Sequence, residues 1–263
     1  MKKYLNIQYL PHLSLGAGLI GLLLQGLLFL LTLDQKGLVA SGHFLNILAW
    51  IVLIAVNVLF AVAVSRLHGH NRYGDNYPAS TLGAIGSFAL AAGILVTVPF
   101  HLDLQGNLLA VLWLVLAVLT VPSLIFTGLC RRSGKRPAFL FHSVTCLFFA
   151  IHLVHCCQSW SSEPQIETYG FSLLASIALM LSAYHRAAFD SGIGRRRMQL
   201  FTGLAAGCLC LAAIPGSQYK LMYLTGSLWA LTNLCVLTPP RRRRRPAEEN
   251  GPAEAAETPD ETL

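Results

Sequence analysis

The stretch from Asn107 to Arg136, NLLAVLWLVLAVLTVPSLIFTGLCRRSGKR, decides the fold of this chain. It carries no charged residue before Arg131, and four basic residues then follow within six positions. An α-helix needs about 20 apolar residues to cross the roughly 30 Å hydrocarbon core of a bilayer. A run of this length with a basic end is typical of a transmembrane helix whose basic end lies in the cytoplasm.

The composition of the whole chain agrees with this interpretation. Of its 263 residues, 54% are hydrophobic and only 12% are charged, whereas soluble domains average about 25% charged residues. The chain is therefore expected to be an integral membrane protein, with the lipid bilayer as its main partner. The net charge of +7 arises from basic loops between apolar runs, so it does not indicate nucleic-acid binding.

Eight such runs predict an all-α polytopic membrane protein, a bundle of eight transmembrane helices. Helix is the expected state because a span in lipid must satisfy its own backbone hydrogen bonds, and the period-two pattern of a barrel strand is absent. The first run is interpreted as an uncleaved span, since it is longer than the core of a signal peptide. A cytoplasmic segment, 1–11, precedes the transmembrane domain, 12–238. The expected spans are residues 12–33, 44–66, 80–99, 107–129, 138–157, 169–187, 197–214 and 219–238.

The basic residues predict the orientation. Of the 19 Lys and Arg residues, all but Lys36 and Lys220 fall on the side that holds both termini and the loops after the second, fourth and sixth runs. The positive-inside rule therefore places both termini in the cytoplasm, and an odd number of spans would break the alternation. The Met-Lys-Lys start and the short loops resemble those of bacterial multi-pass proteins, so the plasma membrane is the expected location.

The segment 239–263 differs in character from the rest. Five consecutive arginines follow Pro239-Pro240, and the remainder is acidic and lacks aromatic residues, which predicts a disordered cytoplasmic tail. The arginine block is expected to contact anionic lipid headgroups, at about 1 kcal/mol per charge. It serves as a topology anchor or as a regulatory contact, and the anchor is the simpler interpretation. The block consists of Arg241, Arg242, Arg243, Arg244 and Arg245.

Two stretches resemble each other within the chain. One begins SLGAGL at Ser14 and the other TLGAIG at Thr81, and both end at Leu-Asp followed by Gln and Gly. A duplicated helical hairpin would explain this similarity, and so would chance, because apolar sequences have low complexity. Both explanations stay open on the sequence alone.

Four amide side chains lie within the expected spans, namely Gln25, Asn46, Asn57 and Asn233. Asn46 and Asn57 are eleven residues apart, which places them on one face of a helix. The four amides predict a polar seam along a ligand path or, as the more ordinary role, hydrogen bonds between helices. No Asp or Glu falls within an expected span. This argues against a proton-driven pump, because intramembrane acids usually mark proton pathways.

The octet AIHLVHCC, residues 150–157, combines imidazoles and thiols at the end of the fifth run. The spacing of His152, His155 and Cys156 lets one helix face present all three side chains to a single cation, as zinc and copper sites require. His43 and His101 could complete such a site. The alternative is that the octet is only the wet, interfacial end of a membrane helix.

Two further hypotheses concern the inner ends of the fifth and sixth runs. His142 and His185 could ligate haem from facing helices. Arg186 and Asp190, spaced four residues apart, could stabilise the end of a helix or belong to a site for an anion or a lipid headgroup.

Three functions therefore stay open. The chain is a small-solute permease or membrane-embedded binding subunit, a non-catalytic scaffold subunit that presents its basic face, or a metal- or haem-binding redox protein. The sequence contains no phosphate-binding loop, HExxH, GxSxG or CxxC motif. It therefore indicates neither an enzyme class nor a cofactor.

Overall fold

The computed structural model describes residues 9–32, 44–67, 73–101, 108–160 and 169–237. Across these ranges the protein is all-α, as predicted, with eight long helices and one short one. The predicted tail with its arginine block, Arg241 to Arg245, lies outside the described residues. The elements are α1 (Leu10–Thr32), α2 (Phe44–Ser65), α3 (Tyr73–Asn76), α4 (Thr81–Phe100), α5 (Leu108–Ser133), α6 (Phe139–Trp160), α7 (Gly170–Ser191), α8 (Arg196–Ala213) and α9 (Lys220–Cys235).

Each of the eight apolar runs coincides with one long helix, with ends that differ by a few residues. Six helices, α1, α2, α4, α5, α6 and α7, are long and apolar enough to cross a membrane by length and composition. The chain is therefore a multi-pass membrane protein. For α8 and α9 a crossing stays a prediction: α8 begins with two arginines, and α9 has 16 residues, about 24 Å of helix. The predicted orientation also stays a prediction.

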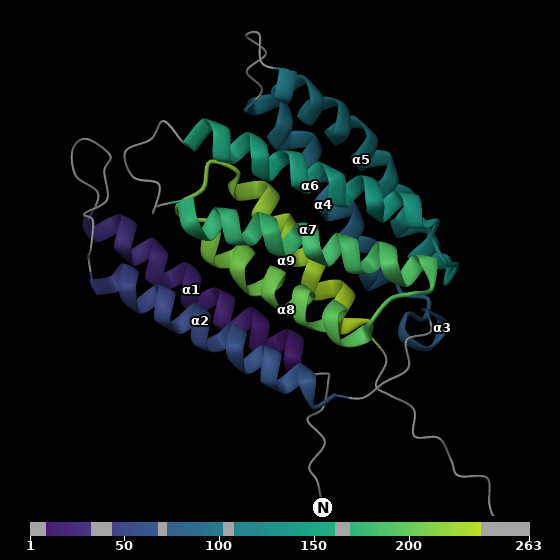
Figure 1. The fold of residues 1–263 in the computed structure, drawn as a ribbon, viewed down its shortest axis with the longest axis horizontal. Helices are drawn as coiled ribbons and strands as arrows, with labels where there is room; N and C mark the ends of the chain where they lie inside the picture. The colour runs from purple at the N-terminus through teal and green to yellow at the C-terminus, as the bar shows by residue number, and fades with distance from the viewer. Residues whose placement is uncertain (1–8, 33–43, 68–72, 102–107, 161–168, 238–263) are drawn as a thin grey trace, which may run out of the picture.

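Helices α4 to α9 form a ring (Figure 1). Each packs against the next one along the chain, and α9 closes the ring by packing against α4. Helices α1 and α2 lie outside the ring as one edge of the bundle, where α1 packs against α8. The outer position of α2 agrees with its low burial, because only 22% of its most apolar stretch is covered by the rest of the protein. Lipid is the expected neighbour of the remaining surface of this helix.

Protein rather than lipid surrounds α8. This helix packs against α1, α2, α7 and α9, and its side chains from Thr202 to Ala213 are all buried. Hydrogen bonds tie it to both sides: Ser14 Oγ donates to the Leu204 carbonyl at 2.7 Å, and Ser227 Oγ donates to the Gly207 carbonyl at 2.9 Å. Because α8 contacts protein on all these sides, its stability in the bundle does not require every side chain on its surface to be apolar.

Two helices extend beyond their expected ends and carry charged residues into the bundle. Helix α5 continues by a turn, so Arg131, expected in a loop, belongs to the helix and is 2% exposed. Helix α7 ends at Gly192, whose positive φ of 93° suits a glycine. Asp190 thus lies within α7 and is buried. The expectation that no span contains a carboxylate is therefore wrong, because α7 runs further than expected and includes Asp190. The Asp190 carboxylate pairs with His142 of α6.

Close packing of α4 on α9 depends on glycine. A Cβ atom at Gly86 would overlap Thr232 Oγ1, and it would lie 3.1 Å from Thr232 Cβ and 3.2 Å from the Cα atom of Trp229. Rotation of the threonine side chain would leave the last two contacts in place. Small residues at such positions allow membrane helices to approach each other closely.

Gly86→Ala should therefore destabilise the protein, because overpacking of a close interface costs about 1–3 kcal/mol. Gly26→Ala is the matched control, since no atom lies within 4 Å of the Cβ position at Gly26 and alanine is the better helix former. Thermal unfolding of the purified variants in detergent should give a lower Tm for Gly86→Ala and an unchanged or higher Tm for Gly26→Ala. Equal Tm values would contradict the close contact between α4 and α9.

Candidate functional site inside the helix ring

One face of α6 is turned towards the interior of the ring. His142, Thr145, Phe148, His152 and Cys156 recur at spacings of three and four residues, and all five are 0% exposed. This periodicity is that of a single helix face. The face shared by these side chains is thus packed against protein and carries several polar groups.

Side chains of α9 and of Tyr219, the residue before it, reach across the ring to the facing helices. The ring centroid of Tyr219 lies 4.8 Å from that of His152 in α6. The hydroxyl of Tyr223 lies 2.8 Å from the hydroxyl of Ser176 in α7. Trp229, further along α9, is fully buried. Large aromatic side chains therefore fill much of the centre of the ring.

Four charged or titratable side chains gather at one end of the ring, and we call them the basic cluster: Arg131, His142, Arg186 and Asp190. They come from the end of α5, the start of α6 and the end of α7, and none is more than 4% exposed. His142 Nδ1 donates a hydrogen bond to Asp190 Oδ2. Arg131 and Asp190 lie near enough to Arg186 for their charges to interact with it, and Asp190 joins His142 to the group.

Aromatic faces cover both guanidinium groups of the basic cluster. The Cζ atom of Arg131 lies 3.8 Å from the ring centroid of Tyr77, and that of Arg186 lies 4.2 Å from the ring centroid of Trp229. A cation–π contact contributes about 0.5–2 kcal/mol, whereas burial of an ion costs several kcal/mol. The aromatic contacts alone therefore do not offset the burial of two arginines.

The edges of both guanidinium groups have no hydrogen-bond partner among the described residues. This applies to Nε and Nη1 of Arg131, to all three nitrogens of Arg186, to Nε2 of His142 and to Oδ1 of Asp190. Buried polar groups in proteins are nearly always paired with protein, water or a ligand. The basic cluster thus offers several donors and an acceptor to a bound molecule.

The predicted i, i+4 pair between Arg186 and Asp190 does not form. Asp190 pairs with His142, and Arg186 packs on Trp229 instead. The reason lies in the tertiary fold, because α6 and α9 bring an imidazole and an indole to positions that a single helix cannot supply. The haem hypothesis for His142 and His185 stays a prediction. His142 is engaged by Asp190, while the half-buried His185 lies against Tyr184, 5.2 Å between ring centroids.

The short helix α3 and Tyr77, which we call the cap, lie against the basic cluster. Tyr77 covers Arg131 and meets Phe189 of α7 edge-on, with 5.8 Å between ring centroids. Tyr73 Oη donates a long hydrogen bond of 3.5 Å to the Lys135 carbonyl. Burial raises the pKa of Tyr73 to about 12. Its phenol is therefore neutral at physiological pH and serves as a donor.

The octet AIHLVHCC is not wet along its inner face. His152 and Cys156 are both 0% exposed, with His152 Nε2 at 3.5 Å from Cys156 Sγ. The expectation that these two residues are wet is wrong, because both are buried and the rings of Trp113 and Tyr219 lie against His152. His155 stacks on Trp113 at 4.8 Å between ring centroids.

The metal site of His152, His155 and Cys156 stays a prediction. Within the described parts of the chain, no three His, Cys, Asp or Glu side chains form a group that could hold a metal ion. His43, which could complete the site, lies outside the described residues. His101 is described, and its ring lies 4.9 Å from that of Tyr219.

The four amides predicted to line a ligand path occupy different surroundings. Gln25 is buried in α1, and its Nε2 has no partner among the described residues. Asn46 is half-buried in α2. Asn57 and Asn233 each donate to the carbonyl four residues earlier in their own helix, at 2.8 and 2.7 Å. Local hydrogen bonds of this kind satisfy the amide without any ligand.

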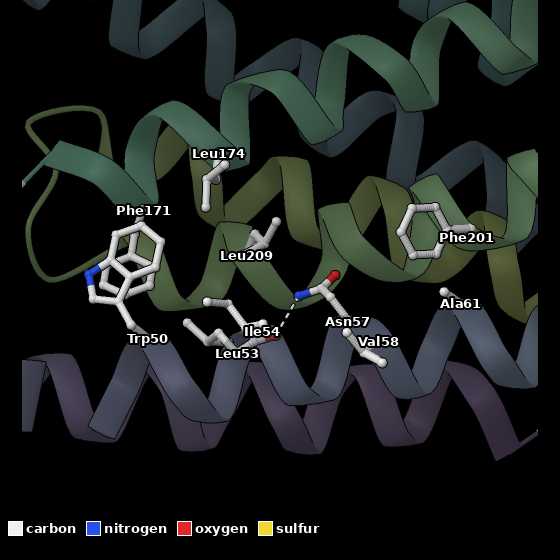
Figure 2. Close-up of a pocket in the computed structure, with 10 residues that line it drawn as sticks. All are labelled: Trp50, Leu53, Ile54, Asn57, Val58, Ala61, Phe171, Leu174, Phe201 and Leu209. Atoms are coloured by element: carbon white, nitrogen blue, oxygen red, sulfur yellow. Dashed lines mark hydrogen bonds between the residues drawn. The ribbon is translucent and has the colours of Figure 1, made fainter. Parts of the chain in front are cut away.

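Asn57 does line a cavity, an apolar groove of about 350 Å³ between α2, α7 and α8. Figure 2 shows Trp50 stacked on Phe171 at one end of the groove and Phe201 near the other. The Asn57 amide lies between these ends, with its NH₂ group turned to the Leu53 carbonyl. The groove lies outside the ring of helices and offers mainly hydrocarbon contacts, which suit a lipid chain rather than a polar solute.

No family model, curated protein or solved structure matches the chain. The site is therefore defined by its own geometry. Sequence reasoning singled out Arg186 and Asp190, with the basic residues at 131–136 nearby, but did not connect His142 with them. One signal was available, because all four residues fall near the inner ends of the fourth, fifth and sixth runs and hence at a similar predicted depth.

Asp190→Asn should strongly destabilise the protein, because it removes the carboxylate that compensates the arginines of the basic cluster. Asp190 is the only negative charge among the four groups, and leaving buried charges uncompensated costs about 3–5 kcal/mol, so we expect Tm to fall by roughly 10 °C. Adding Arg186→Met should recover part of this loss, since it removes excess positive charge. Thermal unfolding of the two variants measures both effects. An unchanged Tm for Asp190→Asn would show that this carboxylate is not the counter-ion.

Proposed function

We propose that the protein is a membrane-embedded, permease-like binding protein for a small solute, which binds at the basic cluster inside the ring. The observation that carries this proposal is the set of buried polar atoms there without partners among the described residues. Each unpaired buried group costs about 1–3 kcal/mol. A bound solute would pair with these groups and offset that cost.

The position of the cluster supports the same proposal. Ionisable residues within membrane helices are costly, face the bundle interior and usually serve a function. The basic cluster lies at the end of the ring beside the cap, and on the predicted orientation this end faces the cytoplasm. Exposed basic residues follow at the end of α5 and in the loop after it, among them Arg132 and Arg136. Positive charge at this end of the ring would attract an anionic solute and repel a cation.

Buried hydroxyl groups continue from the cluster along α7. Ser182 lies one turn before Arg186, is buried, and has no hydrogen-bond partner for its hydroxyl among the described residues. Further along, Ser176 meets Tyr223 across the ring. These hydroxyls could take over hydrogen bonds from a solute that moves deeper into the bundle. This arrangement favours a permease over a protein that binds its ligand at the surface alone.

The proposal can be tested with purified protein in lipid nanodiscs. Thermal unfolding is followed in the presence of small anions, small cations and neutral polar solutes. A solute present at 100 times its Kd stabilises the folded state by about 2.7 kcal/mol, which is a measurable rise in Tm. Solutes that raise Tm are then tested for exchange across proteoliposome membranes, which separates a permease from a binding subunit.

Arg186→Gln should abolish the rise in Tm, because it removes the buried charge and most of the unpaired donors of α7. Arg195→Gln is the matched control, since Arg195 is an exposed arginine at the start of α8. This control should bind the solute as the wild type does. The proposal fails if no solute raises the Tm of the wild type, or if both substitutions reduce binding equally.

A further inference from the structure

We infer that the basic cluster binds a hydrogenphosphate group, supplied either by inorganic phosphate or by a phosphate monoester. This inference rests on the proposed function and adds the chemical class of the solute. It follows from three observations: the excess of positive charge in the cluster, the unpaired edges of the two guanidinium groups, and the unpaired carboxylate oxygen of Asp190.

The charge balance points to an anion. Among the described side chains, the cluster holds the two guanidinium groups of Arg131 and Arg186 and the single carboxylate of Asp190. His142 is neutral when its Nδ1–H donates to Asp190 and its Nε2 carries no proton. An excess of positive charge is therefore buried, and a buried charge requires a counter-ion. A bound anion supplies it.

The arrangement of the arginines points to an oxyanion. Their faces are occupied by Tyr77 and Trp229, while their edges carry the N–H groups that have no partner among the described residues. The edge of a guanidinium group is a planar fork that donates two parallel hydrogen bonds to the oxygens of a phosphate or carboxylate. The two forks come from α5 and α7 and lie near enough for their charges to interact, and the inference requires both to donate to one tetrahedral oxyanion.

The carboxylate of Asp190 selects a protonated oxyanion. Its Oδ2 accepts from His142, whereas its Oδ1 is buried and has no partner among the described residues. An ionised carboxylate only accepts hydrogen bonds, so a ligand can pair with Oδ1 only by donating a proton to it. Hydrogenphosphate carries a P–OH group that can donate to Oδ1. Sulfate at neutral pH and phosphate diesters carry no such proton, and they would bring only acceptors to this carboxylate.

Titration calorimetry of the wild-type protein in phosphatidylcholine nanodiscs tests this selectivity, with phosphate and sulfate as probes. Phosphate should bind at least roughly tenfold more tightly than sulfate. The P–OH group of hydrogenphosphate donates a hydrogen bond to the Asp190 carboxylate, whereas the oxygens of sulfate repel it. Equal affinity for the two ions would overturn the inference. The comparison uses the wild type alone, so it stands even if a variant fails to fold.

The source of the phosphate group is tested with lipids. Nanodiscs that contain phosphatidic acid, a monoester, are compared with nanodiscs that contain phosphatidylglycerol, a diester. If the ligand is a lipid headgroup, phosphatidic acid should raise Tm and compete with free phosphate, whereas phosphatidylglycerol should do neither. If the ligand is a soluble anion, free phosphate should bind equally well in both. Stronger competition by phosphatidylglycerol would contradict the selection of a protonated group.

Two neighbouring arginines provide a matched pair of variants. Arg131 is buried in the cluster, and Arg132, the next residue, is exposed. Arg131→Gln should weaken phosphate binding roughly 10- to 100-fold, whereas Arg132→Gln should change it by less than about twofold, as expected for an exposed charge. Asp190→Asn, measured below its Tm, should reduce the preference for phosphate over sulfate, because an amide NH₂ can donate to either ion. Similar losses in the two arginine variants would overturn the inference.

The remaining outcomes separate this inference from the proposed function. Binding of a neutral or cationic solute that Arg186→Gln abolishes would overturn the phosphate inference and leave the proposed function standing. Failure of every solute to bind would overturn both. An acidic residue of the chain itself would compete with phosphate as the counter-ion of the two arginines. Asp75 is the acidic residue of α3, and Asp75→Asn tests it. If this variant bound phosphate much more tightly than the wild type, the Asp75 carboxylate would be the natural counter-ion, and the inference would be wrong.

Discussion

In hydrocarbon, a polar group that finds no hydrogen-bond partner within the protein costs several kcal/mol, because no water replaces the lost bond. This constraint acts first on the backbone, and it is met by the eight long helices. It acts next on polar side chains. Thr120, Ser123 and Thr127 of α5 each donate to the carbonyl four residues earlier, at 2.7–2.8 Å. Ser14 and Ser227 instead donate to α8 and thereby tie their helices to the centre of the bundle.

The same constraint underlies the function proposed for the basic cluster. Serine and threonine hydroxyls can be satisfied by their own helix, but a guanidinium group has five N–H donors and a full charge. For Arg131 and Arg186 the fold supplies aromatic faces and one nearby carboxylate, Asp190. These contacts leave the guanidinium edges without partners among the described residues. Missing hydrogen-bond partners are expected at a site that alternates between an occupied and an empty state. In a purely structural core, they would only destabilise the fold.

Much of the architecture was predictable because the apolar runs are long and the loops carry turn residues and charges. All eight runs became helices. The errors fell within one turn of helix ends, which sequence patterns locate poorly. They mattered because that extra turn moved Arg131 from a loop into the bundle and Asp190 into a buried pair. The octet AIHLVHCC shows a related error: a position near the end of a helix suggested water, but aromatic rings from α5 and α9 enclose His152.

The sequence by itself determined that this is an all-α membrane protein, where its helices lie and which of their ends are basic, because these properties depend on length, hydropathy and charge along the chain. The tertiary structure alone decided that α4 to α9 close into a ring and that Arg131, His142, Arg186 and Asp190 meet inside it. Periodicity can show that a helix has a polar face, but it cannot show which helix lies opposite. Partners of buried charges come from residues distant in sequence, such as His142 and Asp190, 48 positions apart, so only the packing of helices can reveal them.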